Sequence, residues 1–324
     1  MNAKKANWAF LVTVVAYFLV SFLMLFLPES MTSNLLVTNL LLECALMLPI
    51  LVFILVSKER IWEFLGFHKI KAGTVLMIAL FTVLTAPLLT LVNAISMFWV
   101  DNEAVAMLEG YQTGGMPFWQ LLLATAVIAP LCEEAACRGG FYCAYRKSGS
   151  AVKAMLLSAM VFALIHMNFN QASYAFVMGF LAVLLVEATG SLWSSILYHA
   201  LFNASSSLLV YAVLKNDPQA YADQEVTAEL LMYGVGSYLV ITAVCLPLAF
   251  AVLVWISKHE GKKGFWAEIW KGRKLKPEPA QDQEGRPKKD KLITLPLVAA
   301  LILCLLMMTG ILGSVIIKCV DMLS

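Results

Sequence analysis

Charged side chains are scarce in this sequence, and their scarcity excludes an ordinary soluble protein. Asp, Glu, Lys and Arg make up 14% of the 324 residues, whereas hydrophobic residues make up 61%. Soluble proteins contain about 25% charged and about 45–50% apolar residues. The net charge of +2 is too small to indicate nucleic-acid binding, and no basic segment is interleaved with aromatic residues. We therefore expect a protein that contacts the lipid bilayer and no nucleic acid.

The sequence also lacks the usual signatures of a secreted protein. Three of its seven cysteines, Cys132, Cys137 and Cys143, lie close together but without the C-x-x-C spacing of a metal site. Nothing in the sequence resembles a small disulfide-bonded scaffold. The first apolar run, from Trp8 to Leu27, is longer than the core of a signal peptide, and no A-x-A-like cleavage site follows it. This run is therefore predicted to be a first membrane span.

Hydrophobic residues occur in long blocks. The nine apolar windows are 7–28, 34–57, 73–100, 117–145, 150–168, 171–188, 191–214, 231–256 and 292–317. A helix that crosses the bilayer needs about 20 mainly apolar residues. The pattern predicts an all-α, polytopic transmembrane helix bundle with about eight or nine spans. Pro130 lies inside the long window 117–145, so we expect a kink there or a helix that protrudes from the bilayer.

The loops between these windows alternate in charge. Lys and Arg concentrate in every second loop, with the largest excess in residues 258–291, whereas the intervening loops are acidic or neutral. Basic residues accumulate on the cytoplasmic side of membrane proteins. We therefore expect a multi-pass protein of the cell membrane with its N-terminus in the cytoplasm and its C-terminus outside.

The same boundaries predict three parts of the chain. They are a membrane bundle over 1–256 with a catalytic-type core at 117–210, a basic cytoplasmic linker over 257–291, and a C-terminal transmembrane span over 292–324. The linker and the last span could also bind a protein partner.

Ionisable residues inside apolar windows are costly, so they indicate function by default. They are Glu43, Glu133, Glu134, Arg138, His166 and His199. Glu134 and Arg138 are four residues apart, which is the spacing of an ion pair on a helix. Glu133 lies about 100° around the helix from Glu134, so its carboxylate faces elsewhere. A structural ion pair beside a solvated glutamate is the alternative.

Two of the four histidines lie in apolar windows. A lone histidine on an apolar helix is more often a hydrogen-bonded core residue than a ligand, but His199 has Asn203 four residues further on. Such a pair can donate hydrogen bonds to an oxyanion. With a turn near Ser148, Glu133 and His166 lie about 22 and 27 Å from that turn. An antiparallel hairpin would place both at similar depth, where they could share one water molecule.

Together these residues form three motifs in a fixed order. The motifs are Glu133-Glu134-x-x-x-Arg138, Phe162-x-x-x-His166 and His199-x-x-x-Asn203. This set resembles the CAAX-protease and bacteriocin-processing family of intramembrane glutamic-type endopeptidases over residues 117–210. The resemblance implies that Glu133 and His166 activate water, that His199 and Asn203 stabilise the oxyanion, and that Glu134 and Arg138 organise the site. It implies a membrane-associated peptide or protein as the substrate, and no cofactor.

Other readings of these residues remain open. Glu133, His166 and His199 could instead be three ligands of a zinc ion in a metalloprotease, with water as the fourth ligand. No H-E-x-x-H motif supports this reading, and the nearby Arg138 disfavours a divalent cation. A cysteine peptidase using Cys132 or Cys137 is a further alternative.

Two non-peptidase alternatives also remain. The first is a non-catalytic membrane scaffold or immunity protein that binds a partner enzyme or peptide, although a scaffold has no need of buried ionisable groups. The second is a transporter, in which intramembrane carboxylates and histidines relay protons. The sequence lacks the corresponding broken helices of two transporter halves.

Overall fold

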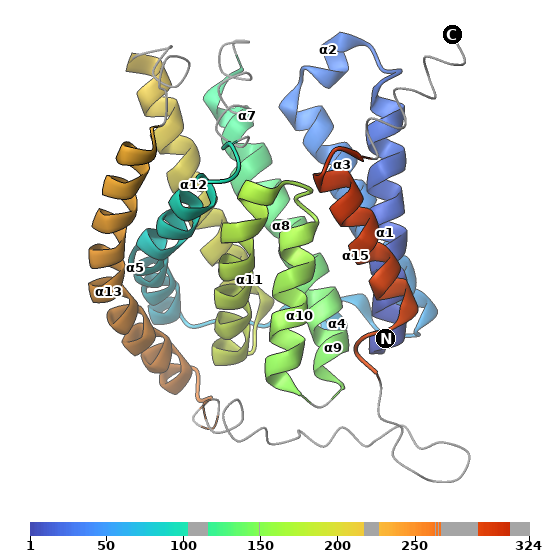
Figure 1. The fold of residues 1–324 in the computed structure, drawn as a ribbon. Helices are drawn as coiled ribbons and strands as arrows, with labels where there is room; N and C mark the ends of the chain where they lie inside the picture. The colour runs from blue at the N-terminus through green and yellow to red at the C-terminus, as the bar shows by residue number, and fades with distance from the viewer. Residues whose placement is uncertain are drawn as a thin grey trace.

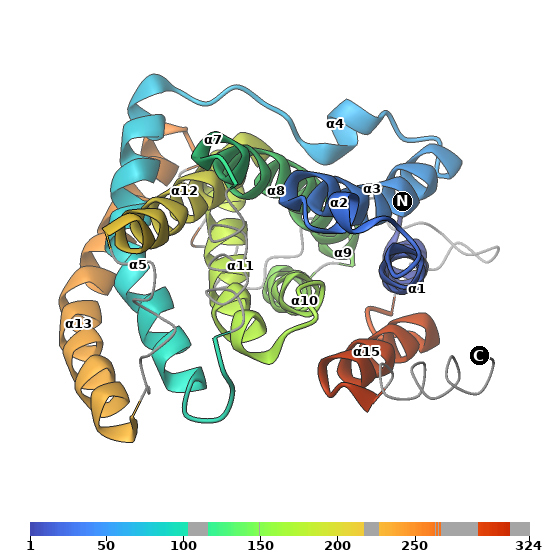
Figure 2. The ribbon, with the colours of Figure 1, turned by 90° about the horizontal axis from the view of Figure 1, so that it is seen from above.

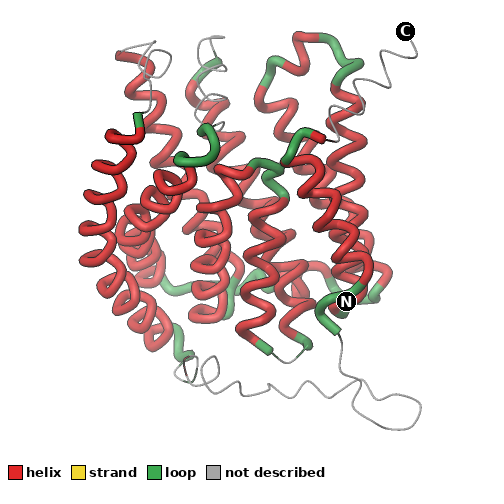
Figure 3. The backbone as a smooth tube through the Cα atoms, viewed as in Figure 1, coloured by secondary structure: helices red, strands yellow, loops and turns green. Residues whose placement is uncertain are grey.

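The computed structural model describes residues 1–102, 116–148, 150–216, 227–262 and 291–311, together with residues 264 and 266. Within these ranges every regular element is a helix, as Figures 1 and 3 show. The helices are α1 (Ala3–Met24), α2 (Glu29–Thr32), α3 (Leu35–Val56), α4 (Ile61–Leu65), α5 (Ala72–Ser96), α7 (Phe118–Leu122), η1 (Leu123–Ile128), α8 (Ala129–Glu134), η2 (Ala135–Tyr142), α9 (Cys143–Arg146), α10 (Ala151–Leu164), α11 (Phe169–Thr189), α12 (Leu192–Asn216), α13 (Ala228–His259) and α15 (Leu295–Met308). The predicted all-α bundle is confirmed.

Seven helices of the described part are long and apolar enough to cross a membrane. They are α1, α3, α5, the continuous run Phe118–Arg146, α11, α12 and α13. The protein is therefore a multi-pass helical membrane bundle. The other two predicted windows contain shorter apolar helices, α10 and α15, of 14 residues each. The predicted last window, 292–317, extends beyond the described residues.

Helix α10 is the element that departs most from the predicted spans. Its 14 residues extend only about 21 Å, whereas the apolar core of a bilayer is about 30 Å thick. The chain turns at Met167, whose φ is 51°. The side chain of Asn168 then caps α11 by accepting a hydrogen bond from the backbone N–H of Gln171. The predicted window 150–168 extended across this turn, because Ile165 and Met167 in it are apolar.

Helices α10 and α11 lie in the middle of the bundle. Figure 2 shows α5 and α13 side by side along one side of this pair, and α1, α3 and α15 on the other. One buried apolar cluster joins α1, α3, η2 and α10, and a second joins α5, α11, α12 and α13. The hydrophobic core therefore lies on both sides of the central pair.

The run Phe118–Arg146 contains two π-helical segments, η1 and η2, which flank α8. At the first, the backbone N–H of Ala129 bonds to the carbonyl of Ala124, five residues back. Pro130 follows directly and has no N–H of its own. The structure thus accommodates Pro130 with a π-helical turn, and π-helical turns are frequent at functional sites.

The second π-helical segment packs tightly against its neighbours. A Cβ atom at Gly139 would lie 2.7 Å from Cδ2 of Leu65, and one at Gly140 would lie 2.8 Å from Cγ2 of Ile50. Only glycine allows α3 and α4 to approach this segment so closely. All eight residues of η2 are buried. The helix that carries both glutamates is therefore held in one position.

The last described helix, α15, packs on α1. The side-chain amide of the buried Asn7 donates hydrogen bonds to the carbonyl of Leu292 (2.7 Å) and to Oγ1 of Thr294 (2.8 Å). Most of the predicted linker 257–291 lies outside the described residues, as do residues 312–324 of the predicted C-terminal span. The predicted domain boundaries and the orientation of the termini stay predictions.

Candidate active site

Glu134 and Arg138 form the predicted ion pair inside the bundle. Nη1 of Arg138 lies 2.8 Å from Oε1 of Glu134, and both side chains are fully buried. Nδ1 of His199 lies 3.0 Å from the same carboxylate oxygen. Removing one partner of a buried ion pair destabilises a protein by about 3–5 kcal/mol, because the other charge is left uncompensated. The contact between Glu134 and His199 joins α8 to α12.

Two further residues shape the pocket for Arg138. Its guanidinium lies 4.0 Å from the centre of the Phe162 ring, a distance at which a cation is attracted to the face of an aromatic ring. A Cβ atom at Gly179 would lie 3.1 Å from Nη2 of Arg138. The sequence motifs included Phe162 without a role and did not include Gly179. A glycine in the middle of an apolar helix is the signal that could have indicated it.

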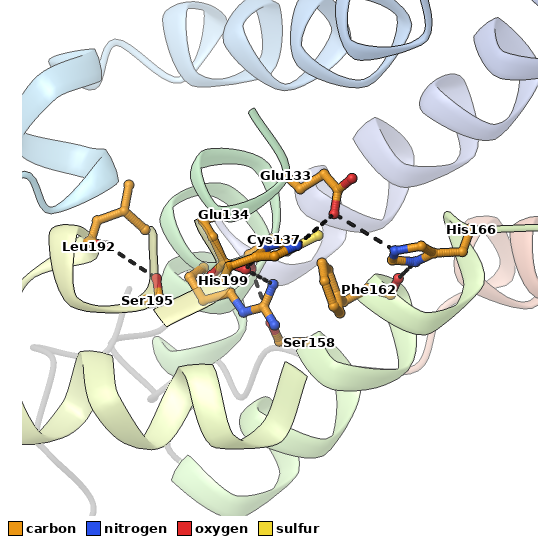
Figure 4. Close-up of polar contacts among 10 residues, drawn as sticks. Glu133, Glu134, Cys137, Ser158, Phe162, His166, Leu192, Ser195 and His199 are labelled. Carbon is orange, nitrogen blue, oxygen red and sulfur yellow. Dashed lines mark hydrogen bonds and ion pairs between the residues drawn. The ribbon is translucent and has the colours of Figure 1, made fainter. Parts of the chain in front are cut away.

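Glu133 points away from this ion pair. Figure 4 shows its carboxylate facing His166 and His199. Oε2 of Glu133 lies 3.8 Å from Nε2 of His166 and 3.9 Å from Nε2 of His199. The predicted proximity of Glu133 and His166 is confirmed. The approach of His199 to Glu133 could not be predicted, because the sequence did not define the turn near Gly190 well enough to set the depth of His199.

Hydrogen bonds indicate which ring nitrogen of each histidine carries a hydrogen. Nδ1 of His166 lies 2.8 Å from the carbonyl of Phe162, which can only accept, so this nitrogen carries the hydrogen. Nδ1 of His199 likewise donates to the carboxylate of Glu134. In a neutral imidazole the other nitrogen is then an acceptor. Both Nε2 atoms face Glu133, and each is an acceptor when its ring is neutral.

Asn203 lies one helical turn beyond His199 on α12. Its Nδ2 donates a hydrogen bond of 2.8 Å to the carbonyl of Thr125 in η1. In a π-helix this carbonyl would bond to the N–H five residues on, but that residue is Pro130. The π-helical segment therefore supplies an acceptor that orients Asn203. An amide has two donor hydrogens, so the second can bond an oxygen in the cavity.

Four of the six predicted site residues line one cavity. Its volume is about 380 Å³, and its lining includes Glu133, His166, His199 and Asn203. The other two, Glu134 and Arg138, lie behind this wall. The lining also contains neutral amides that the sequence motifs missed, among them Asn39, Asn93 and Gln171. The only sequence feature that could have indicated them is that each is an isolated amide near the end of an apolar helix.

Glu43 is the remaining ionisable residue from the apolar windows. It lies on α3, is 5% exposed, and its Oε2 has no hydrogen-bond partner among the described residues. It is not among the residues that line the cavity. The structure therefore places Glu43 outside the group formed by Glu133 and the two histidines.

The alternative chemistries fit this geometry less well. In the described ranges, no group of three His, Cys, Asp or Glu residues is spaced to hold a metal ion. Neither Cys132 nor Cys137 is among the residues that line the cavity. Cys137 is fully buried, and its backbone carbonyl accepts a hydrogen bond from the Ser158 hydroxyl.

Fold and site together define a multi-pass helical membrane protein with a carboxylate and two imidazoles around a cavity. Residues 115–205 match the family model described as type II CAAX prenyl endopeptidase Rce1-like. This segment extends from just before α7 to just beyond Asn203 in α12. The resemblance predicted from the motifs is confirmed, and it indicates a membrane endopeptidase, whereas bacteriocin processing stays a prediction. No curated protein and no solved structure was found to match the chain.

Proposed function

We propose that the protein is an intramembrane endopeptidase in which Glu133, assisted by His166, activates a water molecule. The observation that carries this proposal is the approach of Oε2 of Glu133 to two imidazole nitrogens inside a cavity. Separations of 3.8 and 3.9 Å exceed a direct hydrogen bond. At the ordinary hydrogen-bond distance of about 2.8 Å, one water molecule can bond to two such atoms at once.

The chemical step follows from these positions. Glu133 takes a proton from the water as the water oxygen forms a bond to the peptide carbonyl carbon, and the carbonyl oxygen becomes an oxyanion. The lone pair on Nε2 of His166 accepts a hydrogen bond from the second hydrogen of the water, which orients the water and stays bonded to its oxygen. Glu133 then returns its proton to the amide nitrogen, the C–N bond breaks, and an acid and an amine leave. General acid–base catalysis of this kind contributes about 10²–10⁴-fold in rate.

Asn203 and His199 are proposed to stabilise the oxyanion. Asn203 supplies one N–H while its other hydrogen bonds to the carbonyl of Thr125, which prevents the amide from rotating. His199 donates through Nε2 only when both ring nitrogens carry a proton, because its Nδ1 hydrogen already bonds to Glu134. Glu134 and Arg138 act as positioning residues that hold His199.

The test compares the peptides released from membranes that contain the wild type or Glu133→Gln. The matched control is Glu63→Gln, because Glu63 lies on α4, pairs with Arg60 at the surface and is mostly exposed. We expect a set of fragments that disappears in Glu133→Gln and persists in Glu63→Gln. Identical fragments in all three samples would reject the peptidase and favour the scaffold. A partner pull-down that Glu133→Gln leaves unchanged would then support that alternative.

A further inference from the structure

The cavity is built from one end of the bundle. Its lining takes Leu35 and Asn39 from the start of α3, Asn93 from the end of α5, Gln171 from the start of α11, and Ser206 from the second half of α12. These ends lie at the top of the bundle in Figure 1. Glu133 and His199, nearer the middle of their helices, form the floor of the cavity.

The short helix α10 explains why the cavity is open at this end. Figure 1 shows that the connection between α10 and α11 stops well below the tops of α3, α7 and α12. His166 lies at this recessed turn, and Gln171 and Tyr174 follow it on α11. At the end of the bundle where the cavity lies, the turn between α10 and α11 is thus recessed relative to α3, α7 and α12.

The opposite end of the bundle is closed. All eight residues of η2, which continue the helix below Glu134, are buried. Further out, Arg146 pairs with Glu187 on α11, and Lys147 donates a hydrogen bond of 2.9 Å to Glu59. Packed side chains and these ion pairs therefore separate Glu133 from the loops at the bottom of Figure 1.

The two ends also differ in charge. The closed end carries Lys58, Arg60, Lys69 and Lys71 in one connection. At the open end, the connections 25–34, 97–117 and 217–227 contain no Lys or Arg. Basic loops remain in the cytoplasm. The open end therefore faces away from the cytoplasm.

The lining indicates what kind of chain the cavity binds. Asn39, Asn93, Gln171 and Ser206 are neutral groups that both donate and accept hydrogen bonds, as the polar groups of a peptide backbone require. None of the described lining residues is Lys or Arg. A free terminal carboxylate in this cavity would lack a cationic partner, and an unpaired buried charge is costly.

We infer that the substrate enters from the non-cytoplasmic face as an uncharged internal polypeptide segment, rather than as a terminal carboxylate presented from the cytoplasm. This inference rests on the proposed function, because it concerns the same cavity. The expected substrates are secreted or membrane-inserted polypeptides that have an extended, charge-free segment near the outer bilayer surface.

Cysteine labelling in intact cells tests the direction of entry. The full-length chain, with its seven cysteines replaced by alanine, receives Gln171→Cys or, as a second reporter, Ser206→Cys, both in the cavity lining. Lys69→Cys in the basic loop and the fully buried Ala182→Cys on α11 are the controls. A membrane-impermeant cationic thiosulfonate is added before or after the cells are permeabilised.

We expect both reporters to be labelled fully before permeabilisation, Lys69→Cys only afterwards, and Ala182→Cys in neither condition. Labelling of both reporters only after permeabilisation, or in neither condition, would overturn the direction of entry. Glu133-dependent fragments found alongside that result would leave the peptidase intact and reject only this inference. Outside labelling without any Glu133-dependent fragment would instead reject the peptidase.

The cleavage sites test the substrate class. We expect Glu133-dependent cuts to fall within charge-free segments of exported chains, with both product fragments detected. Glu133-dependent release of short C-terminal peptides from cytoplasmic proteins would overturn the assignment of the substrate, while it would support cleavage itself.

Discussion

Two adjacent glutamates on one helix have opposite surroundings. Glu134 is fully buried, and its Oε1 is bonded to both Arg138 and His199. Glu133 is partly exposed to the cavity, and its Oε2 has no hydrogen-bond partner among the described residues. About 100° of helix rotation separates the two. The core-facing carboxylate is positioned to hold the structure together, and the cavity-facing one is free to react.

The comparison separates stability from chemistry. A buried ion pair fixes the positions of its neighbours, whereas an unpaired carboxylate beside two imidazoles contributes little to folding. Substitutions on the two faces of this helix should therefore have distinct effects on cleavage and on unfolding.

The largest effect is expected for Glu133→Gln. The substitution keeps the shape of the side chain and removes the proposed base, so cleavage should fall about 10⁴-fold, which corresponds to about 5.5 kcal/mol. Thermal unfolding of the purified protein should not change. Fragment release under single-turnover conditions measures the cleavage rate, and thermal unfolding in the same detergent measures the stability. A variant that cleaves at the wild-type rate would remove Glu133 from the mechanism.

Arg138→Ala should act mainly on stability. It leaves the fully buried Glu134 uncompensated and should lower the free energy of unfolding by about 3–5 kcal/mol. The matched control is Arg60→Ala, whose side chain is 82% exposed and whose ion pair is worth about 1 kcal/mol or less. Denaturant titration compares them. Equal stabilities for both variants would show that the buried pair has no structural role.

Asn203→Ala should reduce the rate of the chemical step. Loss of one oxyanion donor typically lowers kcat about 10²–10³-fold, or about 2.7–4 kcal/mol. Asn216→Ala is the control on the same helix, because Asn216 is exposed and bonds only to the carbonyl of Ala212 in the described structure. Steady-state kinetics distinguishes stabilisation of the oxyanion, which changes kcat, from binding of the substrate, which changes KM. A change confined to KM would indicate that Asn203 binds substrate without acting on the oxyanion.

Gly179→Ala should have a smaller effect. The added methyl would lie 3.1 Å from Arg138, Phe162 and Ala159, so these residues must shift. Overpacking of this kind costs about 1–3 kcal/mol. Gly234→Ala is the control, since nothing lies within 4 Å of a Cβ atom there. Unfolding midpoints compare the two variants. An unchanged midpoint for Gly179→Ala would show that the pocket around Arg138 accommodates the added methyl group without loss of stability.

The smallest effect is expected from metal chelation. Glu133 activates water without a metal ion on this proposal, so dialysis against a strong zinc chelator should leave cleavage unchanged. Metal analysis of the purified protein accompanies the assay. Loss of cleavage that zinc restores would favour the zinc alternative with Glu133, His166 and His199 as ligands.

Helix periodicity was sufficient to predict much of this site. The spacing of Glu134 and Arg138 predicted their ion pair, and the helix rise predicted that Glu133 and His166 lie at one depth. Hydropathy also predicted the helical bundle, because long apolar runs have few alternatives in a membrane.

Features that depend on packing could not be predicted. The hydropathy pattern does not show where α10 ends, because Ile165 and Met167 in the turn are themselves apolar. The bond from His199 to Glu134 depends on how α12 is placed against α8, which no local pattern specifies. The bond from Asn203 to Thr125 depends on a π-helical turn, whereas Pro130 predicted a kink or a helix that protrudes from the bilayer.

Direct attack by water is the central claim, and trapping with hydroxylamine during hydrolysis in ¹⁸O-labelled water tests it most directly. A peptide identified by its Glu133-dependent cleavage is hydrolysed in ¹⁸O-labelled water, with hydroxylamine present in a parallel reaction. We expect one labelled oxygen in the new carboxyl group and no hydroxamate, because no acyl-enzyme forms. Hydroxamate that disappears in Cys132→Ala or Cys137→Ala would contradict the role of Glu133 and identify a cysteine nucleophile.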